Sequence, residues 1–255
     1  MEGYLTMTRS ISYILVCVFV TILDRPVFAA DTPGGSNAAS TSPWTGVYIG
    51  GHIGFGAGRT HWDNESTTST VPDFGPGAHI TSHRTNGFIG GGHLGINYQL
   101  GALVFGIEPE YSGATLHGKS SSNLIPGDDR YSTRIRGLFS AAARVGYATD
   151  KWLTYLRVGY ASGNVKTRFE DSTGPEQGSG SNSELHHGFI MGPGLEYMLG
   201  SNIVLGAEYN YLDLGEKKHK LGGAGTSLAG TIVNKVDVGG IHRLNVRVSY
   251  LFNWQ

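Results

Sequence analysis

The chain has 255 residues, 40 of them glycine, and a formal net charge of −1 that gives no reason to expect nucleic acid as a partner. Charged residues make up only 15% of the chain, against roughly 25% in ordinary soluble domains, yet no apolar run in its body reaches the ~18 residues of a membrane helix. Few charges, many glycines and 13 tyrosines therefore favour a membrane β-barrel over a soluble core.

The N-terminus has the three parts of a secretory signal peptide. Arg9 supplies the positive charge, residues 11–23 are mostly apolar, and residues 27–29 place small side chains where a signal peptidase reads them. We therefore expect a signal peptide over 1–29, because the apolar run is too short for a retained membrane anchor. The single cysteine, Cys17, lies inside this run. The mature chain is then free of cysteine, which excludes disulfides, thiolate metal sites and a cysteine nucleophile.

Beyond this segment, residues 30–43 are small and polar and are interpreted as a flexible N-terminal leader. From Trp44 onward, segments of two-residue alternation follow one another, each with one apolar face and one polar or glycine-rich face. Eight such strands are predicted, at about 44–57, 88–98, 103–111, 134–147, 152–160, 185–197, 203–211 and 241–254.

The connections between these strands alternate in length. The long ones lose the alternation and collect Asn, Ser, Thr, Asp and Gly, which predicts loops. They span 59–84, 113–132, 163–184 and 213–240. Short turns such as 99–101 join the other strand pairs. An even strand number with alternating loops and turns is typical of bacterial outer-membrane barrels. We therefore predict an all-β protein of the cell outer membrane, with an eight-stranded antiparallel transmembrane β-barrel over 44–255.

The charges assign the two faces of each strand. When the apolar residues point outward, the outer face of the predicted strands carries no Asp, Glu, Lys or Arg. A slip of one residue would exchange the faces and move charges into lipid, at about 2–4 kcal/mol for each basic residue at midplane. The predicted lumen then holds a charge network of mixed sign. Its predicted members are Glu108, Glu110, Arg136, Arg144, Arg157, Glu196, Glu208 and Arg247.

Aromatic residues gather at both ends of the predicted strands, as in the girdles where amphipathic rings meet lipid headgroups. A soluble sandwich, which stays an alternative fold together with a lipocalin-like barrel, does not call for them. The loop-side aromatic residues are Phe55, Phe88, Tyr111, Tyr160, Tyr209 and Tyr211. The turn-side aromatic girdle is predicted to contain Trp44, Tyr98, Tyr147, Trp152, Tyr197, Tyr250 and Phe252.

The small size of the ring limits what its lumen can do. Eight strands enclose an interior just wide enough to be filled by side chains. Charges buried in a low dielectric are strongly driven to pair, so a plug of ion pairs is favoured. A narrow porin-like pore for small solutes stays open as an alternative, because the inward glycines leave some room for water.

Histidine is the one chemically suggestive excess, with 10 residues. Imidazole ligates haem iron and divalent metals. His61, His79, His83, His117 and His219 fall in the predicted long loops, which gives a haemin-binding surface protein as a second alternative. No spacing matches a defined metal motif, so neither a metal site nor a cofactor is predicted.

Catalysis needs a nucleophile beside a base and an orienting acid. His186 and Glu196 share one face of a predicted strand, but they would lie roughly 30 Å apart along it. No catalytic residues are predicted, and we expect no enzyme activity.

Two segments carry a resemblance to a known family. Residues 44–56, WTGVYIGGHIGFG, resemble the opening strand of the small outer-membrane immunogenic proteins of alphaproteobacteria. These are porin-family β-barrels similar in build to the membrane domain of outer membrane protein A. Residues 90–99, GGGHLGINYQ, resemble that family's second strand, and the resemblance covers about 44–254. Such barrels usually end on an aromatic residue, whereas this chain continues to Gln255, which leaves Phe252 and Trp254 as alternative insertion signals.

The resemblance implies an abundant surface barrel that supports envelope integrity, and some relatives bind haemin. It defines no set of binding residues. We therefore expect a surface antigen with a structural or surface-interaction role in the bacterial envelope. The expected partners are outer-membrane lipid and lipopolysaccharide, the barrel-insertion machinery, and host or environmental ligands at the extracellular loops.

Overall fold

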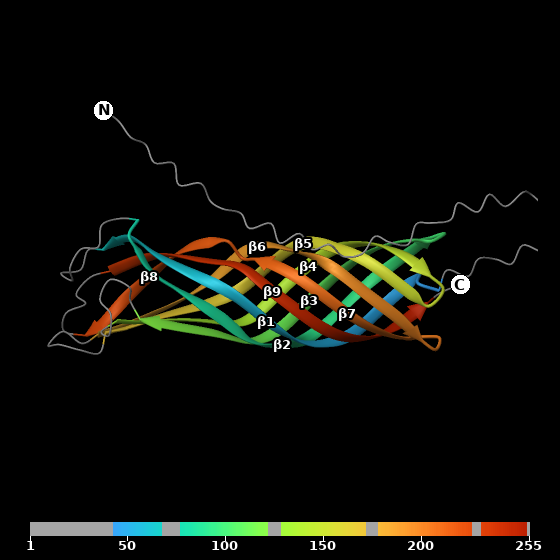
Figure 1. The fold of residues 1–255 in the computed structure, drawn as a ribbon, viewed down its shortest axis with the longest axis horizontal. Coiled ribbons are helices and arrows are strands. Elements are labelled where there is room, and N and C mark those ends of the chain that lie inside the picture. The colour runs from blue at the N-terminus through green and yellow to red at the C-terminus, as the bar shows by residue number, and fades with distance from the viewer. Residues whose placement is uncertain (1–42, 68–76, 122–128, 172–177, 226–230, 254–255) are drawn as a thin grey trace, which may run out of the picture. The chain divides into compact units, whose positions relative to one another are not determined.

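The structure is a computed structural model that describes residues 43–67, 77–121, 129–171, 178–225 and 231–253. In these residues nine strand segments form one closed antiparallel sheet (Figure 1). Their bounds are Gly46–Thr67 (β1), His79–Leu100 (β2), Leu103–Ser121 (β3), Asp129–Thr149 (β4), Trp152–Asp171 (β5), Gly178–Leu199 (β6), Ile203–Asp213 (β7), Glu216–Gly225 (β8) and Thr231–Asn253 (β9). The predicted signal peptide and nearly all of the predicted leader lie outside the described residues.

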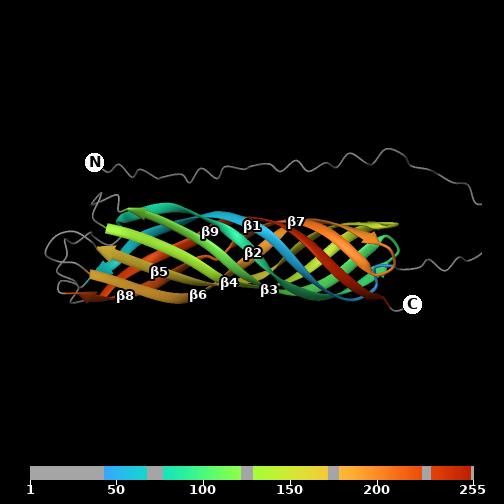
Figure 2. The same ribbon diagram turned by 90° about the horizontal axis from the view of Figure 1, so that it is seen from below.

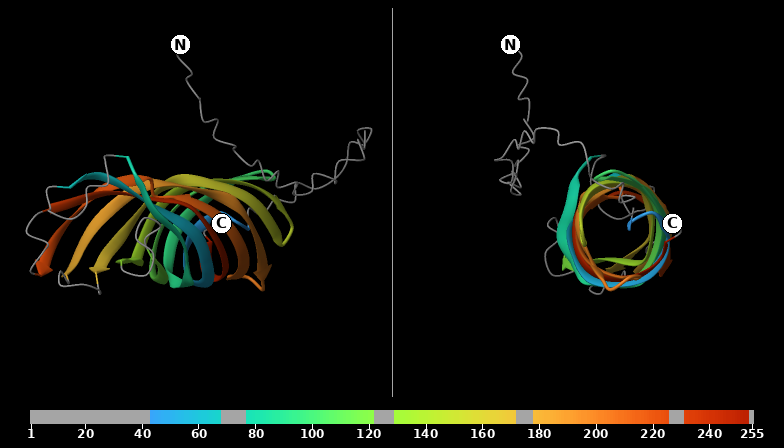
Figure 3. Two further views of the ribbon diagram at one scale, coloured as in Figure 1. Left: turned by 60° about the vertical axis from the view of Figure 1, so that its left-hand side comes forward. Right: turned by 90° about the vertical axis from the view of Figure 1, so that its right-hand side faces the viewer.

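The sheet closes into a ring because the last strand pairs with the first. β1 and β9 are hydrogen-bonded along most of their length, and a view down the axis shows the ring (Figure 3). β7 and β8 together form one interrupted strand of the barrel, since each pairs with β6 and with β9. The interruption lies at Gly215, whose φ of 64° suits glycine. When β7 and β8 are counted as one strand, eight strands complete the ring in the described residues. The predicted eight-stranded antiparallel barrel is confirmed.

The outer face of the ring carries an apolar band (Figure 2 shows the tilted strands that form it). Large apolar side chains stand exposed there, up to 72% for Ile53 and 73% for Phe88, while their neighbours along each strand point inward and are buried. This arrangement suits a surface that faces lipid. The described residues include no helix with the length and hydropathy needed to cross a membrane.

The prediction of four long loops is wrong over most of their length, because the strands extend into these segments. β1 runs to Thr67 and β2 begins at His79, and the other three hairpins extend in the same way. Above the lipid, the outer face meets water and becomes polar, while threonines and apolar residues share the inner face. The contrast between the two faces that marks a membrane strand is therefore lost, although the strand itself goes on.

Two apolar clusters fill the interior on either side of the barrel's middle. The loop-side cluster includes Trp62, Leu116, Ile135, Val165 and Val236, each almost fully buried. The turn-side cluster consists of Trp44, Tyr48, Val104, Ala148, Leu153, Tyr155, Met198, Val204 and Leu251. The interior is therefore packed with side chains at both ends.

Trp44 belongs to this turn-side cluster and not to the outer girdle, so its predicted position was wrong. It is 1% exposed, lies just before β1 and points inward with Tyr48, which is on the even-numbered, inward face of that strand. The other predicted girdle members do lie on the outer face at the turn side. Tyr197 is half-buried there against Trp152, with ring centroids 4.6 Å apart.

We expect Leu116→Ala to lower the free energy of unfolding by about 2–5 kcal/mol, because it would leave a cavity in the loop-side cluster. Equilibrium unfolding of the refolded barrel in detergent micelles measures this change. Leu94→Ala, on the lipid-facing surface, is the control and should cost less because Leu94 is 54% exposed. An equal or smaller loss at Leu116 would mean that this part of the chain is not a packed strand.

Candidate functional site

A layer of charged side chains crosses the lumen between the two apolar clusters. Four acids and four arginines are buried there, each no more than 5% exposed, so their formal charges cancel. The acids are Glu108 and Glu110 on β3, Glu196 on β6 and Glu208 on β7. The arginines are Arg144 on β4, Arg157 on β5, and Arg243 and Arg247 on β9. We call these eight residues the lumen network.

Arg247 and Arg157 lie at the centre of the lumen network. Arg247 donates to both carboxylate oxygens of Glu108 and, at 2.6 Å, to Glu208. Arg157 contacts Glu208 at 2.6 Å, Glu110 at 3.2 Å and Glu108 at 3.3 Å. Each guanidinium therefore joins carboxylates from two strands, which holds β3, β7 and the arginine's own strand at fixed positions.

Arg144 extends the lumen network toward the turn side. Its two terminal nitrogens donate to both oxygens of Glu196, at 3.0 and 3.1 Å, and its Nε donates to Asn97 at 3.0 Å. The guanidinium carbon lies 4.7 Å from the ring centroids of both Tyr48 and Tyr155. Paired hydrogen bonds and cation–π contacts together fix this side chain.

Arg243 is a member that the sequence prediction missed. It donates to both oxygens of Glu110, at 2.5 and 3.2 Å. The signal was available, since Arg243 shares its odd-numbered face with Arg247 on the last strand. Its place at the start of that predicted strand, beside a predicted long loop, hid it.

Arg136 does not belong to the lumen network, so its predicted inward position was wrong. The register of β4 shifts between Ile135 and Gly137, which inserts one extra residue and exchanges the faces of the strand beyond it. Ile135 is consequently buried, whereas Arg134 and Arg136 stand exposed on the outer surface. The bulge was hidden because Ile135 between Arg134 and Arg136 continues the odd-apolar, even-polar alternation of Phe139 and Ser140.

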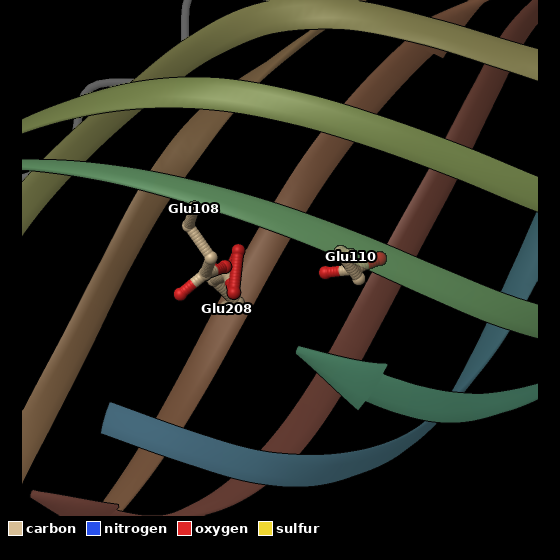
Figure 4. A group of neighbouring side chains, drawn as sticks. All are labelled: Glu108, Glu110 and Glu208. Carbon is tan, nitrogen blue, oxygen red and sulfur yellow. The ribbon is translucent and has the colours of Figure 1, made fainter. Parts of the chain in front are cut away.

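Three carboxylates of the lumen network come close enough together to suggest a cation site. Glu108 and Glu110 reach inward from β3 and Glu208 from β7 (Figure 4), and one oxygen of each lies within 4.8 Å of the others. Oxygen ligands of this kind suit Ca²⁺ or Mg²⁺. Arg157 already contacts all three, and Arg247 contacts two of them. The guanidiniums thus occupy the positions that a cation would need.

A serine, a histidine and a carboxylate also meet inside the barrel. His52 Nε2 lies 2.8 Å from Ser112 Oγ and 3.8 Å from Glu110, and His93 Nε2 lies 2.8 Å from Ser249 Oγ. A hydrolase would need its serine open to substrate and its acid placed to orient the imidazole. Ser112 is fully buried and itself donates to Glu110. This arrangement is suited to satisfying buried polar groups, not to hydrolysis.

The five histidines of the predicted loops lie on strands and point to different places. His83 and His219 are buried inside the barrel, and burial lowers the pKa of His83 to about 4. His61, His79 and His117 are on the outer surface. His61 and His79 lie together beside Ser82, with ring centroids 6.2 Å apart, but the five histidines do not converge on one site, and haemin binding stays a prediction.

Little free space remains in the turn-side half of the lumen. A cavity of about 10 Å³ lies among Trp44, Tyr48, Arg144 and Glu196 and neighbouring side chains. That volume holds about one water molecule. The arrangement of the described residues is therefore that of a packed core.

Comparison with known proteins agrees with this architecture. A family model described as an outer membrane protein β-barrel domain matches residues 28–252. The 31 kDa outer-membrane immunogenic protein of Brucella melitensis is 28% identical over 215 residues, which cover 80% of this chain and 85% of that protein. A 22 kDa outer membrane protein of Rhizobium leguminosarum is 31% identical over 198 residues, with 77% and 76% covered.

Among solved structures, that of the outer membrane protease OmpT from Escherichia coli aligns with 81% of this chain and 97% of its own. The TM-score is 0.50 and the sequence identity 9%, which shows a shared fold alone. The resemblance seen in the first two strands is confirmed by the family match and by the named relatives. The chain belongs to the outer membrane β-barrel family and is a protein of the bacterial outer membrane.

Proposed function

We propose that this protein is a closed barrel with a structural and surface-interaction role in the outer membrane, and that it is not an enzyme. The observation that carries the proposal is the lumen network, whose eight charges are buried and bonded to one another. Its relatives are named as immunogenic proteins, which supports a role at the cell surface.

A conducting lumen would require these contacts to break. An ion crossing the middle would have to separate carboxylates from guanidiniums in a low dielectric, which costs several kcal/mol for each pair. It would also have to displace the apolar clusters at both ends. The alternative of a narrow pore is therefore less well supported than a solid core that keeps the barrel rigid.

The surface-interaction part of the proposal depends on the strand extensions above the apolar band. A membrane strand needs about 9–11 residues to cross the bilayer, whereas β1 has 22 residues and β9 has 23. The excess lies on the loop side and presents polar side chains to water. This rigid, exposed part of the barrel is the region that a host or environmental ligand would contact.

We expect the refolded protein to give no steady openings in planar lipid bilayers, because the described lumen is packed from end to end. The heat-dependent shift in gel mobility that folded barrels show serves as the control for folding. Steady single-channel openings from protein that passes this control would contradict the proposal and support a pore.

We expect Arg243→Ala to lower the free energy of unfolding by about 3–5 kcal/mol, because it leaves Glu110 buried with too little positive charge. Arg136→Ala removes the same side chain from an exposed position on β4 and should change stability by less than about 0.5 kcal/mol. Urea unfolding in micelles compares the two variants. Equal effects would show that the lumen network is not a stabilising core.

A further inference from the structure

The outer surface changes abruptly just above the loop-side aromatic residues of β2 to β5. Tyr111 on β3 and Phe139 on β4 are paired in register and face outward. A few residues further along, the outward positions become basic. The five residues that we call the basic rim are all exposed: Arg84 on β2, Lys119 on β3, Arg134 and Arg136 on β4, and Lys166 on β5.

The strand register brings these cations side by side. His117 is paired with Arg134, and Arg134 is paired with Lys166 on the next strand. Residues directly opposite on neighbouring strands have Cβ atoms about 4.5–5.5 Å apart, where like charges repel. The basic rim therefore gathers positive charge that needs an anion close by.

Among the described residues, no side chain supplies such an anion. The side chains of the five basic-rim residues make no ion pair with any described residue, whereas four basic residues elsewhere on the outer surface of the loop-side half do. Those pairs are Arg168–Glu170, Lys217–Glu184, Lys218–Glu65 and Lys235–Glu216. The charge of the basic rim is therefore not neutralised by the side chains of the described residues, which leaves it available to an external anion.

A hollow lies at the foot of the basic rim. It has a volume of about 740 Å³ and is lined by residues 113–115 together with His117, Lys119, Arg134 and Arg136. Gly113, one of its lining residues, has no side chain and is paired in register with Gly90 on β2 and Gly137 on β4. The hollow therefore lies between the outward aromatic residues Tyr111 and Phe139, which we call the aromatic row, and the cations of the basic rim.

We propose that this hollow binds the phosphorylated headgroup of an outer-leaflet glycolipid. Arginine and lysine side chains are the common partners of phosphate, and the aromatic row marks the level of the lipid headgroups. A phosphate at this height is attached to a lipid, and its acyl chains lie against the apolar band below. Lipopolysaccharide, an expected partner, has this chemistry. The proposal rests on the outer-membrane location and extends the proposed surface-interaction role.

The first experiment titrates refolded protein in detergent micelles with fluorescently labelled lipopolysaccharide. We expect the triple variant Lys119→Gln, Arg134→Gln, Arg136→Gln to weaken binding by at least about tenfold, since a hydrogen bond between charged groups contributes about 1.5–3 kcal/mol. The control variant Lys218→Gln, Lys220→Gln, Lys235→Gln removes the same charge from β8 and β9. It should bind within about twofold of wild type. Equal weakening by the two variants, or by neither, would overturn the proposal.

Two further arms separate the source of the phosphate and the role of the hollow. Enzymatically dephosphorylated lipopolysaccharide should bind wild type and the triple variant alike, and millimolar inorganic phosphate should not displace the intact lipid. Displacement would assign the site to free phosphate. Gly113→Leu fills the hollow without changing charge, since the nearest atom to an added Cβ is the Gly90 carbonyl oxygen at 3.7 Å. If this variant bound lipopolysaccharide as tightly as wild type, the hollow would not be the binding site, and the attraction would come from the general positive charge of the surface.

Discussion

Charge neutrality inside a low dielectric is the constraint on which the rest of this barrel depends. Four carboxylates and four guanidiniums can be buried in the lumen only because they satisfy one another, since an unpaired charge there would cost several kcal/mol. The network joins strands that are distant in the sequence, as in the contact of Arg247 on β9 with Glu108 on β3. It therefore fixes the cross-section of the ring as well as filling it. The two apolar clusters keep water away from the ion pairs, which strengthens them further.

The sequence was sufficient to predict the fold and most of the lumen network, because a charged side chain in contact with lipid has a high free-energy cost. A charge on the outer face is so unfavourable that the position of Glu108 or Arg157 determines the orientation of its whole strand. Above the membrane this restriction ends. Polar residues are then acceptable on both faces, and the strand extensions could not be separated from loops by their alternation.

The errors at single residues have separate origins. Arg136 is the extra residue of a bulge that no residue type indicates, and the faces of β4 are exchanged on its loop side. Trp44 was assigned by its residue type, although its even position placed it with Tyr48 on the inside. Arg243 needed only the alternation to be continued by four residues. The pairing of the acids with the arginines could not be predicted from the sequence, because it depends on which strands face each other across the ring.

The distribution of the network along the chain also sets an order of assembly. Two of the four arginines, Arg243 and Arg247, lie on β9, the last strand to be made and the one that closes the ring against β1. Before β9 joins, the four acids face only Arg144 and Arg157, so the network of the unclosed sheet carries a net charge of −2. A sheet that lacks β9 would thus leave two carboxylate charges of its inner face uncompensated. Closure by the final strand supplies the two missing guanidiniums and restores neutrality at the same step that completes the ring.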